Sequence, residues 1–206
     1  MFPQTLYPKT KQVLDKLSEH DFLSDFYLAG GTGLALQLGH RKSIDLDFFA
    51  QKPFDRDILL QNLSAFSPTI TQEAPGTIDC IIDTVKVSFL LYTYPLISNM
   101  SQFEKVSVAS INDIACMKLS AISSRGAKKD FIDLYVILES GFTLTALFEM
   151  FEQKFTGVSY NRMHILKSLV YFDDATNDPE PEYLSTFLVE WKSVINRLQN
   201  EVTKLL

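Results

Sequence analysis

The chain has 206 residues, of which 46% are hydrophobic and 12% aromatic, so it is long and apolar enough to form a packed core. Its formal net charge of −6 argues against a broad nucleic-acid-binding surface, because non-specific affinity for phosphates comes mainly from Lys and Arg. No apolar segment is long enough to span a bilayer, so we expect a soluble, cytoplasmic protein without a membrane partner. Cys80 and Cys116 show no metal-ligand spacing and are expected to be buried thiols.

The first half of the chain alternates between helix and strand patterns. In chain order, we predict a helix over 10–20, a strand over 26–29, a helix over 32–38, a strand over 44–49 and a helix over 55–65 capped by Asp55. Strands over 69–72, 77–82 and 85–92 follow, with one more over 105–109. These elements predict a mixed sheet with helices.

After Ser110 helical patterns dominate. We predict helices over 110–123, 128–139, 143–155, 161–172 and 182–206, with the acidic, proline-containing stretch 173–182 as the best linker. The aromatic residues of these helices are expected in the core: Phe148, Phe151, Phe155, Tyr171, Phe172, Phe187 and Trp191. The sequence therefore predicts two domains, residues 1–109 and residues 110–206.

Paired glycines end the predicted 26–29 strand and lead into a helix. Gly30 and Gly31 would let the backbone approach a phosphate closely, and the helix amides from Thr32 onward would point toward it. An ordinary tight turn explains the glycines equally well. Two other phosphate-binding motifs fail, since Leu36 occupies the last glycine position of G-x-G-x-x-G and no G-K-[ST] sequence follows.

Two aspartates alternate along the next strand. Asp45 and Asp47 at i and i+2 would share one face, while Ile44, Leu46 and Phe48 fill the other. At about 6 Å and an effective dielectric near 20, the two carboxylates repel by about 3 kcal/mol, which favours a proton or a divalent cation between them. Mg²⁺ is the best candidate, and a surface motif without function is the alternative. We therefore predict a polyphosphate and metal site here.

Positive charge is concentrated just before these aspartates and again between residues 118 and 129. Arg41 and Ser43 are well placed to contact a phosphate. Lys118 and Arg125 lie seven residues apart on a predicted helix, so they share a face and could reach one anion. A solvated helix face is the alternative explanation for this pair.

The spacing of Gly31-Thr32 and Asp45-x-Asp47 resembles the G-[GS]-x-D-x-D signature of polymerase β-like nucleotidyltransferases. The strings GGTGLALQLGHRKSIDLDFF and MKLSAISSRGAKKDFIDLYVIL resemble the AbiEii nucleotidyltransferase toxin family, which is related to the MenT toxins. The match spans roughly residues 26–138. The resemblance implies an α/β (α+β) fold, with a polymerase β-like core built on a mixed sheet and a helical C-terminal domain.

The resemblance also implies an Mg²⁺-dependent enzyme that moves a nucleotide from a nucleoside triphosphate to an acceptor. The acceptor would be an RNA, with tRNA favoured, or a protein side chain. The expected role is the toxin of a bacterial toxin–antitoxin or phage-defence pair with a cognate antitoxin. By this resemblance, Asp45 and Asp47 hold the metal, Gly30, Gly31 and Thr32 line the phosphates, and Lys118 with Arg125 stabilises the departing pyrophosphate.

The K-D-x-x-D element contributes essential acidic and basic groups in the resembled family, which assigns such roles to Lys129, Asp130 and Asp133. The first turn of a helix stabilises acidic residues in any case, and Asp133 could instead pair with Arg125 or Lys129. These explanations stay open at this point.

One position departs from the resembled pattern. Polymerase β-like enzymes place a third carboxylate on a neighbouring strand, and Ser88 stands at that position here. Asp130 or Asp83 supplies the missing oxygen, or a single metal suffices, or the enzyme is weakly active. Two other functions remain open: a nucleotide-binding module without catalysis, and nucleotidyl or phosphoryl transfer to a small molecule.

Overall fold

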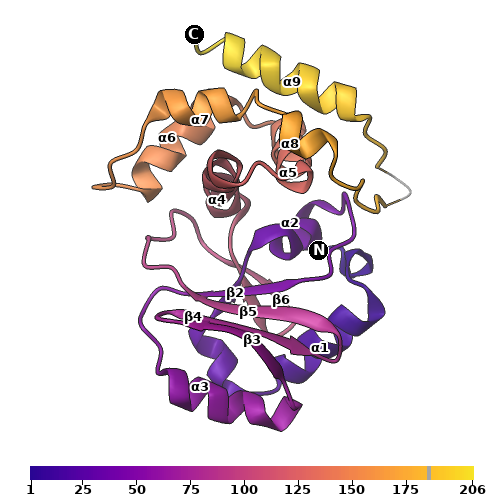
Figure 1. The fold of residues 1–206 in the computed structure, drawn as a ribbon, viewed down its shortest axis with the longest axis vertical. Helices are drawn as coiled ribbons and strands as arrows, with labels where there is room; N and C mark the ends of the chain where they lie inside the picture. Colours follow the sequence, from indigo (N-terminus) through magenta and orange to yellow (C-terminus); the bar gives the residue numbers. More distant parts are fainter. Residues whose placement is uncertain (185–186) are drawn as a thin grey trace. The chain divides into compact units, whose positions relative to one another are not determined.

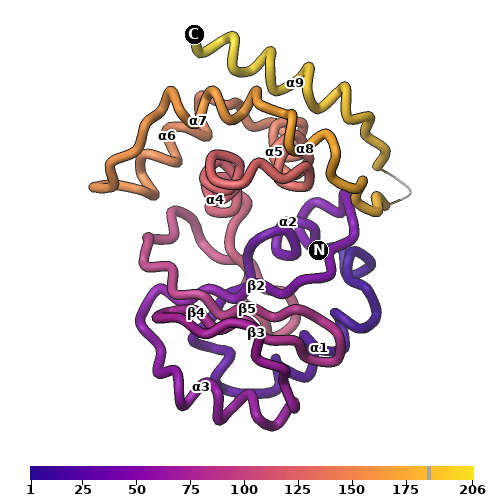
Figure 2. Tube along the Cα trace, in the orientation of Figure 1, coloured from indigo at the N-terminus to yellow at the C-terminus, as the bar shows by residue number. Residues whose placement is uncertain are grey.

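The computed structural model describes residues 1–184 and 187–206, and the chain divides into two compact units. Unit 1 comprises Met1–Pro95 and Asn99–Ser110, and unit 2 comprises Leu96–Ser98 and Ile111–Leu206. Figure 2 traces the chain through each unit. The short segment Leu96–Ser98 therefore belongs to unit 2, although unit 1 residues flank it on both sides.

Unit 1 is built on a seven-stranded mixed sheet with the order β3-β4-β5-β2-β1-β7-β6. The strands are β1 Tyr27–Leu28, β2 Leu46–Ala50, β3 Thr69–Ala74, β4 Thr77–Ile82, β5 Val85–Leu91, β6 Ser101–Phe103 and β7 Val106–Val108. β2 runs parallel to β5 and antiparallel to β1. The predicted mixed sheet is confirmed, but β6 was not among the predicted strands.

Helices cover both faces of this sheet (Figure 1). The helices α1 Pro8–Ser18 and α3 Arg56–Leu63 lie on one face, and α2 Gly30–Leu38 lies on the other. The first face buries an aromatic cluster, in which Phe48 stacks on Phe89 with ring centroids 5.4 Å apart. Asp55 caps α3 as predicted, accepting hydrogen bonds from the amides of Asp57 and Ile58.

The start of β2 differs from the prediction. The strand begins at Leu46, and Ile44 is 57% exposed, so the prediction that Ile44 fills the buried face is wrong. Local contacts hold the chain away from the sheet at this point, since Ser43 forms an isolated bridge with Leu6 and the Thr10 hydroxyl donates to the Ile44 carbonyl at 3.1 Å.

Unit 2 is helical, and α4 packs against three of its neighbours, α5, α6 and α7, while α5 also packs against α8 and α9. The helices are α4 Ile111–Ser124, α5 Lys128–Glu139, α6 Leu144–Lys154, α7 Arg162–Ser168, α8 Asp173–Thr176 and α9 Trp191–Thr203. The predicted helix over 182–206 is too long, because residues 182–184 and 187–190 are not helical and residues 185–186 lie outside the described residues. The predicted helix over 161–172 ends early, at Ser168.

The aromatic residues expected in the core of unit 2 do not all lie there. Phe148, Phe151, Phe155 and Phe172 are buried, and Phe187 and Trp191 are half-buried. Tyr171 is 55% exposed, so its assignment to the core is wrong. The turn after α7 directs the adjacent Phe172 inward instead. Its ring packs against that of Phe131, with the ring centroids 5.2 Å apart.

Both cysteines are buried and unbridged, as expected. Burial raises the pKa of the Cys80 thiol to about 11 and that of Cys116 to about 12. Among the described residues, no single helix has the length and hydropathy to cross a bilayer. The pair α5 and α6 passes together by length and composition alone, but the chain bends by 112° between them.

A buried ion pair fixes the segment Leu96–Ser98 within unit 2. Lys154 Nζ lies 2.7 Å from Asp113 Oδ1, and both side chains are fully buried. The Asp113 carboxylate also accepts hydrogen bonds from the amides of Ile97 and Ser98 at 3.0 and 3.3 Å. These charge-assisted bonds hold the segment to α4 and α6.

Replacing Lys154→Met should destabilise unit 2, because it leaves the Asp113 carboxylate buried without its cation. We expect the free energy of unfolding to fall by about 3 kcal/mol. Urea unfolding followed by the fluorescence of Trp191, the single tryptophan, would measure it. Lys192→Met, at an exposed position of α9, is the matched control, and equal losses in the two variants would contradict the expectation.

Candidate functional site

Two glycines shape the start of α2. Gly30 has a φ of +61°, a conformation that favours glycine, and a Cβ there would lie 2.6 Å from Asp47 Oδ2. A Cβ on Gly31 would collide with the guanidinium of Arg41. A carboxylate and a guanidinium therefore lie directly against the first turn of this helix, whose amides can bind an anion.

A hydroxyl network ties the same turn to the segment before β2. The hydroxyls of Thr32 and Ser43 are hydrogen-bonded at 2.7 Å, and Thr32 also donates to the Asp45 carbonyl. Arg41 is buried, and its Nη1 donates to the carbonyl of Lys42 at 3.0 Å. Five predicted nucleotide-binding residues thus gather around one helix N-terminus: Gly30, Gly31, Thr32, Arg41 and Ser43.

The two aspartates stand on either side of Leu46, the first residue of β2. Asp47 is the carboxylate beside Gly30. Asp45 lies one residue before the strand and lines a cavity of about 470 Å³, whose walls include Ile81 and Lys86. Both aspartates are partly exposed, so a ligand can approach them.

Strand register places three polar residues in one row. Asp47 pairs with Ser88 of β5, and Ser88 pairs with Asp79 of β4. Directly paired residues share a face of the sheet, so Asp79 adds a carboxylate to the face that carries Asp47. Asp79 is not among the predicted site residues, although the apolar Ile78 and Cys80 on either side, both buried, indicate that it lies on this face.

The two carboxylates considered as substitutes for a carboxylate at Ser88 have other partners. Asp83 lies in the β4–β5 turn and accepts a hydrogen bond from Lys16 of α1 at 2.8 Å. This bond lowers the pKa of Asp83. In unit 2, both carboxylate oxygens of Asp130 accept hydrogen bonds from side-chain cations.

Those cations belong to a charged quartet in unit 2, formed by Lys118, Arg125, Asp130 and Asp133. Lys118 Nζ lies 2.8 Å from Asp130 Oδ1 and 2.5 Å from Asp133 Oδ2. Arg125 donates to Asp130 from Nε at 2.7 Å and from Nη2 at 3.0 Å. Lys118 and both aspartates are buried, whereas the Arg125 side chain is 58% exposed. Lys118 and Arg125 thus act on one shared carboxylate.

The quartet controls the ionisation of Asp130. Burial by itself would raise the pKa of this carboxyl, but the charge of Lys118 and the hydrogen bonds from Arg125 and Lys118 outweigh it and hold the pKa below its usual range. A carboxyl whose pKa is lowered by folding stabilises the native state above its unfolded pKa of about 3.9. That stabilisation is lost as the pH falls through the folded pKa.

Of the two adjacent lysines at the start of α5, the predicted Lys129 is exposed and Lys128 is buried. Lys128 Nζ donates to the carbonyls of Thr176 and Asp178 at 3.3 and 2.7 Å and lies 3.1 Å from Glu180. The acidic stretch predicted as a linker is therefore held to α5 by one lysine. Nothing in a Lys-Lys pair indicates which of the two is buried.

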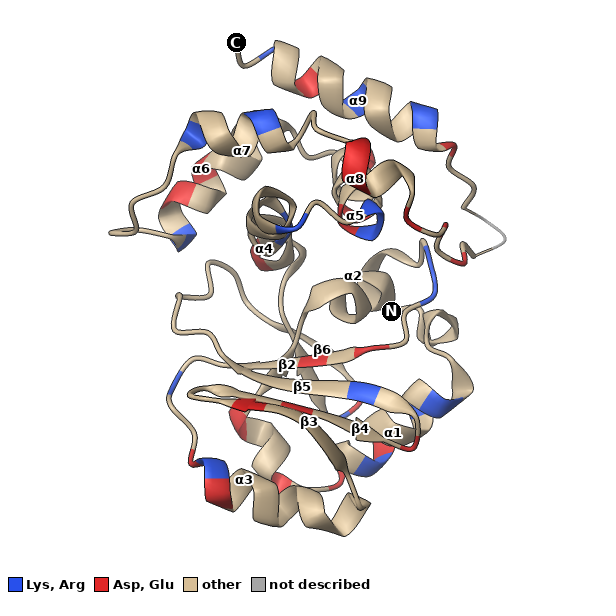
Figure 3. Ribbon diagram, viewed as in Figure 1, with Lys and Arg blue, Asp and Glu red and all other residues tan. Residues whose placement is uncertain are grey.

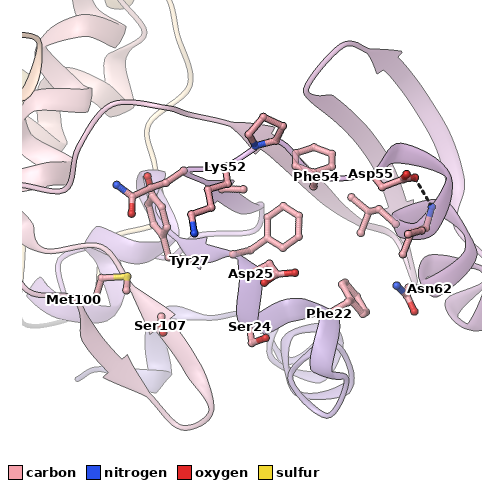
Figure 4. Close-up of a pocket in the computed structure, with 16 residues that line it drawn as sticks. Phe22, Ser24, Asp25, Tyr27, Lys52, Phe54, Asp55, Asn62, Met100 and Ser107 are labelled. Carbon is pink, nitrogen blue, oxygen red and sulfur yellow. Dashed lines mark hydrogen bonds between the residues drawn. The ribbon is translucent and has the colours of Figure 1, made fainter.

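A second cavity of unit 1, of about 530 Å³, lies at the other end of β1 and β2. Figure 4 shows Tyr27, Lys52, Phe54 and Asp25 around it. None of the predicted site residues, all of which the structure describes, lines this cavity. It is therefore separate from the group at the start of α2.

Gly30→Ala should destabilise unit 1 for two reasons. The alanine would have to adopt a left-handed backbone conformation, and its Cβ would collide with the Asp47 carboxylate. Gly157→Ala is the matched control, since Gly157 also has a positive φ of +81° but nothing within 4 Å of an added Cβ. We expect the free energy of unfolding to fall by about 1 kcal/mol in the control and by more in Gly30→Ala, as measured by chemical unfolding. Equal losses would show that the Asp47 contact is unimportant.

Asp130→Asn should lower the free energy of unfolding by about 2 kcal/mol at neutral pH, because it removes a buried, ion-paired carboxylate. Since the folded pKa is depressed, the difference from the wild type should shrink as the pH falls below about 4. Unfolding curves between pH 7 and pH 3 measure this, with Asp173→Asn, an exposed aspartate, as the control. If the difference in free energy of unfolding between Asp130→Asn and the wild type did not change with pH, the lowered pKa of Asp130 would be contradicted.

The chain matches the family described as Nucleotidyl transferase AbiEii toxin, Type IV TA system, over residues 12–95 and 91–204. It is 36% identical over 179 residues to the uncharacterized protein aq_aa25 of Aquifex aeolicus (strain VF5), covering 84% of this chain and 86% of that protein.

Three solved structures show a similar fold. JHP933 from Helicobacter pylori has a TM-score of 0.55 at 16% identity, covering 100% of this chain and 93% of that one. MenT4, a nucleotidyltransferase toxin of Mycobacterium tuberculosis H37Rv, has a TM-score of 0.54 at 14% identity, covering 88% and 76%. The antibiotic-resistance factor ANT(2'')-Ia has a TM-score of 0.51 at 13% identity, covering 69% and 90%. By its match over almost its whole length, the chain belongs to the AbiEii nucleotidyltransferase toxin family and is a nucleotidyltransferase.

Proposed function

We propose that this nucleotidyltransferase uses Mg²⁺ to transfer a nucleotide from a nucleoside triphosphate to a hydroxyl group of an RNA, with tRNA the favoured acceptor. One observation carries the proposal: the Asp47 carboxylate lies against Gly30 at the N-terminus of α2. Helix N-termini favour phosphates and carboxylates favour Mg²⁺, so the two halves of a metal–triphosphate complex would be bound side by side.

The donor set of unit 1 fits this ion. Mg²⁺ is usually held by one or two carboxylates, with water and substrate phosphates as its other ligands. Among the described residues, no group of three or more His, Cys, Asp and Glu side chains could hold a metal alone. Asp45 and Asp47 would therefore hold Mg²⁺ jointly with the triphosphate, and the ion would neutralise charge on its phosphates.

The other residues would bind and align the nucleotide. The amides of Gly30 and Gly31, with Arg41 and Ser43, would contact phosphate oxygens, and Thr32 would keep the segment before β2 in place through its two hydrogen bonds. An acceptor hydroxyl would attack the α-phosphorus, forming a new P–O bond while the bond to pyrophosphate breaks. Lys118 and Arg125 of unit 2 stay predicted to stabilise the charge on the departing pyrophosphate. Lys129, Asp130 and Asp133 stay predicted to be the essential acidic and basic groups of the K-D-x-x-D element.

The family's type IV toxin–antitoxin description supports a cellular role as a toxin. We propose that the protein acts in the cytoplasm and is neutralised by a cognate antitoxin. In the alternative reactions, a hydroxyl of a protein or of a small molecule would replace the RNA. Nucleotidyl transfer to either would release pyrophosphate, whereas phosphoryl transfer to a small molecule would release a nucleoside diphosphate.

The test is label transfer from each α-³²P nucleoside triphosphate to total RNA in the presence of Mg²⁺. We expect labelled RNA and pyrophosphate with the wild type, and at least about a hundredfold less of each with Asp45→Ala or Asp47→Ala. Asp173→Asn, at an exposed position of unit 2, should retain full activity. Label on protein alone would refute the RNA acceptor, and tight triphosphate binding without release of pyrophosphate or nucleoside diphosphate would indicate a non-catalytic module.

A further inference from the structure

Unit 2 contains a cavity of about 410 Å³, and Arg125 is the one residue of its lining that already has a proposed role. Its walls come from the end of α4, the turn after it, α7 and the start of α8. They include Arg125, His164, Lys167, Tyr171 and Asp174. A cavity of this volume is large enough for one small ligand, and its polar groups come from three separate helices and a turn.

The cavity carries exposed positive charge, whereas three other lysines of unit 2 are buried. Lys118, Lys128 and Lys154 are all buried and paired with carboxylates. Lys167 is exposed near the end of α7 and forms no ion pair with any described residue. In Figure 3 the positive residues of α7 lie near both of its ends. A strongly hydrated, uncompensated ammonium group at a cavity wall suits a phosphate.

Arg125 is held in a fixed orientation at the same cavity. Asp130 binds its Nε and Nη2 edge, while more than half of the side chain remains exposed. A guanidinium that is anchored on one edge loses little freedom when it binds a phosphate. His164 lines the same cavity, and its Nε2 lies 3.2 Å from the carbonyl oxygen of Ser123.

Tyr171 gives the cavity an aromatic wall, and the residue is more than half exposed. The neighbouring Phe172 takes the core position, so Tyr171 contributes little to packing. An exposed aromatic ring beside phosphate-binding cations is typical of proteins that stack unpaired bases. The Asp174 carboxylate can accept hydrogen bonds from a base amino group or from a 2′-hydroxyl.

We infer that this cavity binds one nucleotide of a single-stranded segment of the RNA acceptor, with the phosphate at Arg125 and Lys167 and the base on Tyr171. The inference rests on the proposed function, because it names the binding place of the proposed acceptor. The net charge of −6 and the presence of Asp174 restrict binding to a local contact. The strand is single because a duplex hides the faces of its bases.

The test uses the full chain, a short fluorescein-labelled single-stranded RNA, EDTA and no nucleoside triphosphate, with fluorescence anisotropy as the readout. We expect Tyr171→Leu to raise the Kd about tenfold and Tyr171→Phe to leave it near the wild-type value, because a phenyl ring still stacks. Lys167→Ala should raise the Kd severalfold and reduce the slope of log K against log salt by about 0.7. Lys192→Ala, which removes the same charge from α9, should bind like the wild type.

Three outcomes would overturn the inference: wild-type affinity in both Tyr171→Leu and Lys167→Ala, an equal loss in Lys192→Ala, or an equal loss in Tyr171→Phe and Tyr171→Leu. Turnover separates this failure from that of the proposed function. We expect Lys167→Ala to raise the KM for RNA without changing kcat. A wild type that binds no RNA refutes the cavity assignment, while label transfer to another acceptor would still establish nucleotidyl transfer.

Discussion

The close approach of the Asp47 carboxylate to the backbone of Gly30 is the constraint on which the site of unit 1 depends. A side chain at position 30 would occupy the space that the carboxylate uses, and the φ of +61° would strain any other residue. Gly31 makes equivalent room for the Arg41 guanidinium. The first turn of α2 therefore meets one anionic and one cationic side chain. That arrangement is suited to a phosphate that arrives with a metal ion.

Unit 2 uses charge in a different way. Most of its buried lysines are structural, since Lys154 fixes the segment Leu96–Ser98 through Asp113, and Lys128 fixes the residues after α8. Burying a charge is favourable only when it is paired and hydrogen-bonded, and each of these lysines meets that condition. Among the cations of unit 2 that remain exposed, Arg125 and Lys167 line the same cavity. The position of these two exposed cations, more than the number of positive residues, therefore indicates where unit 2 can bind an anion.

Local patterns were sufficient to predict much of the fold. The predicted 77–82 strand and 128–139 helix coincide with β4 and α5, and Asp55 caps α3 as expected. The patterns failed where tertiary contacts determine which side chain is buried. Ile44 looked like the start of a strand, yet the Leu6–Ser43 bridge and the hydrogen bond from Thr10 hold it outside. Tyr171 looked like a core residue, yet the turn after α7 gives that place to Phe172.

The sequence alone determined that the glycine turn and the paired aspartates form one local motif, because only one short helix separates the glycines from the aspartates. Only the tertiary structure decided which groups share a space. Strand register placed Ser88 of β5 between Asp47 of β2 and Asp79 of β4. No sequence spacing shows this row, because β2 and β5 are paired across about forty residues of chain. Helix packing likewise directed both Lys118 and Arg125 to Asp130. Pairing partners and burial depend on three-dimensional packing, and a single sequence carries that information only indirectly.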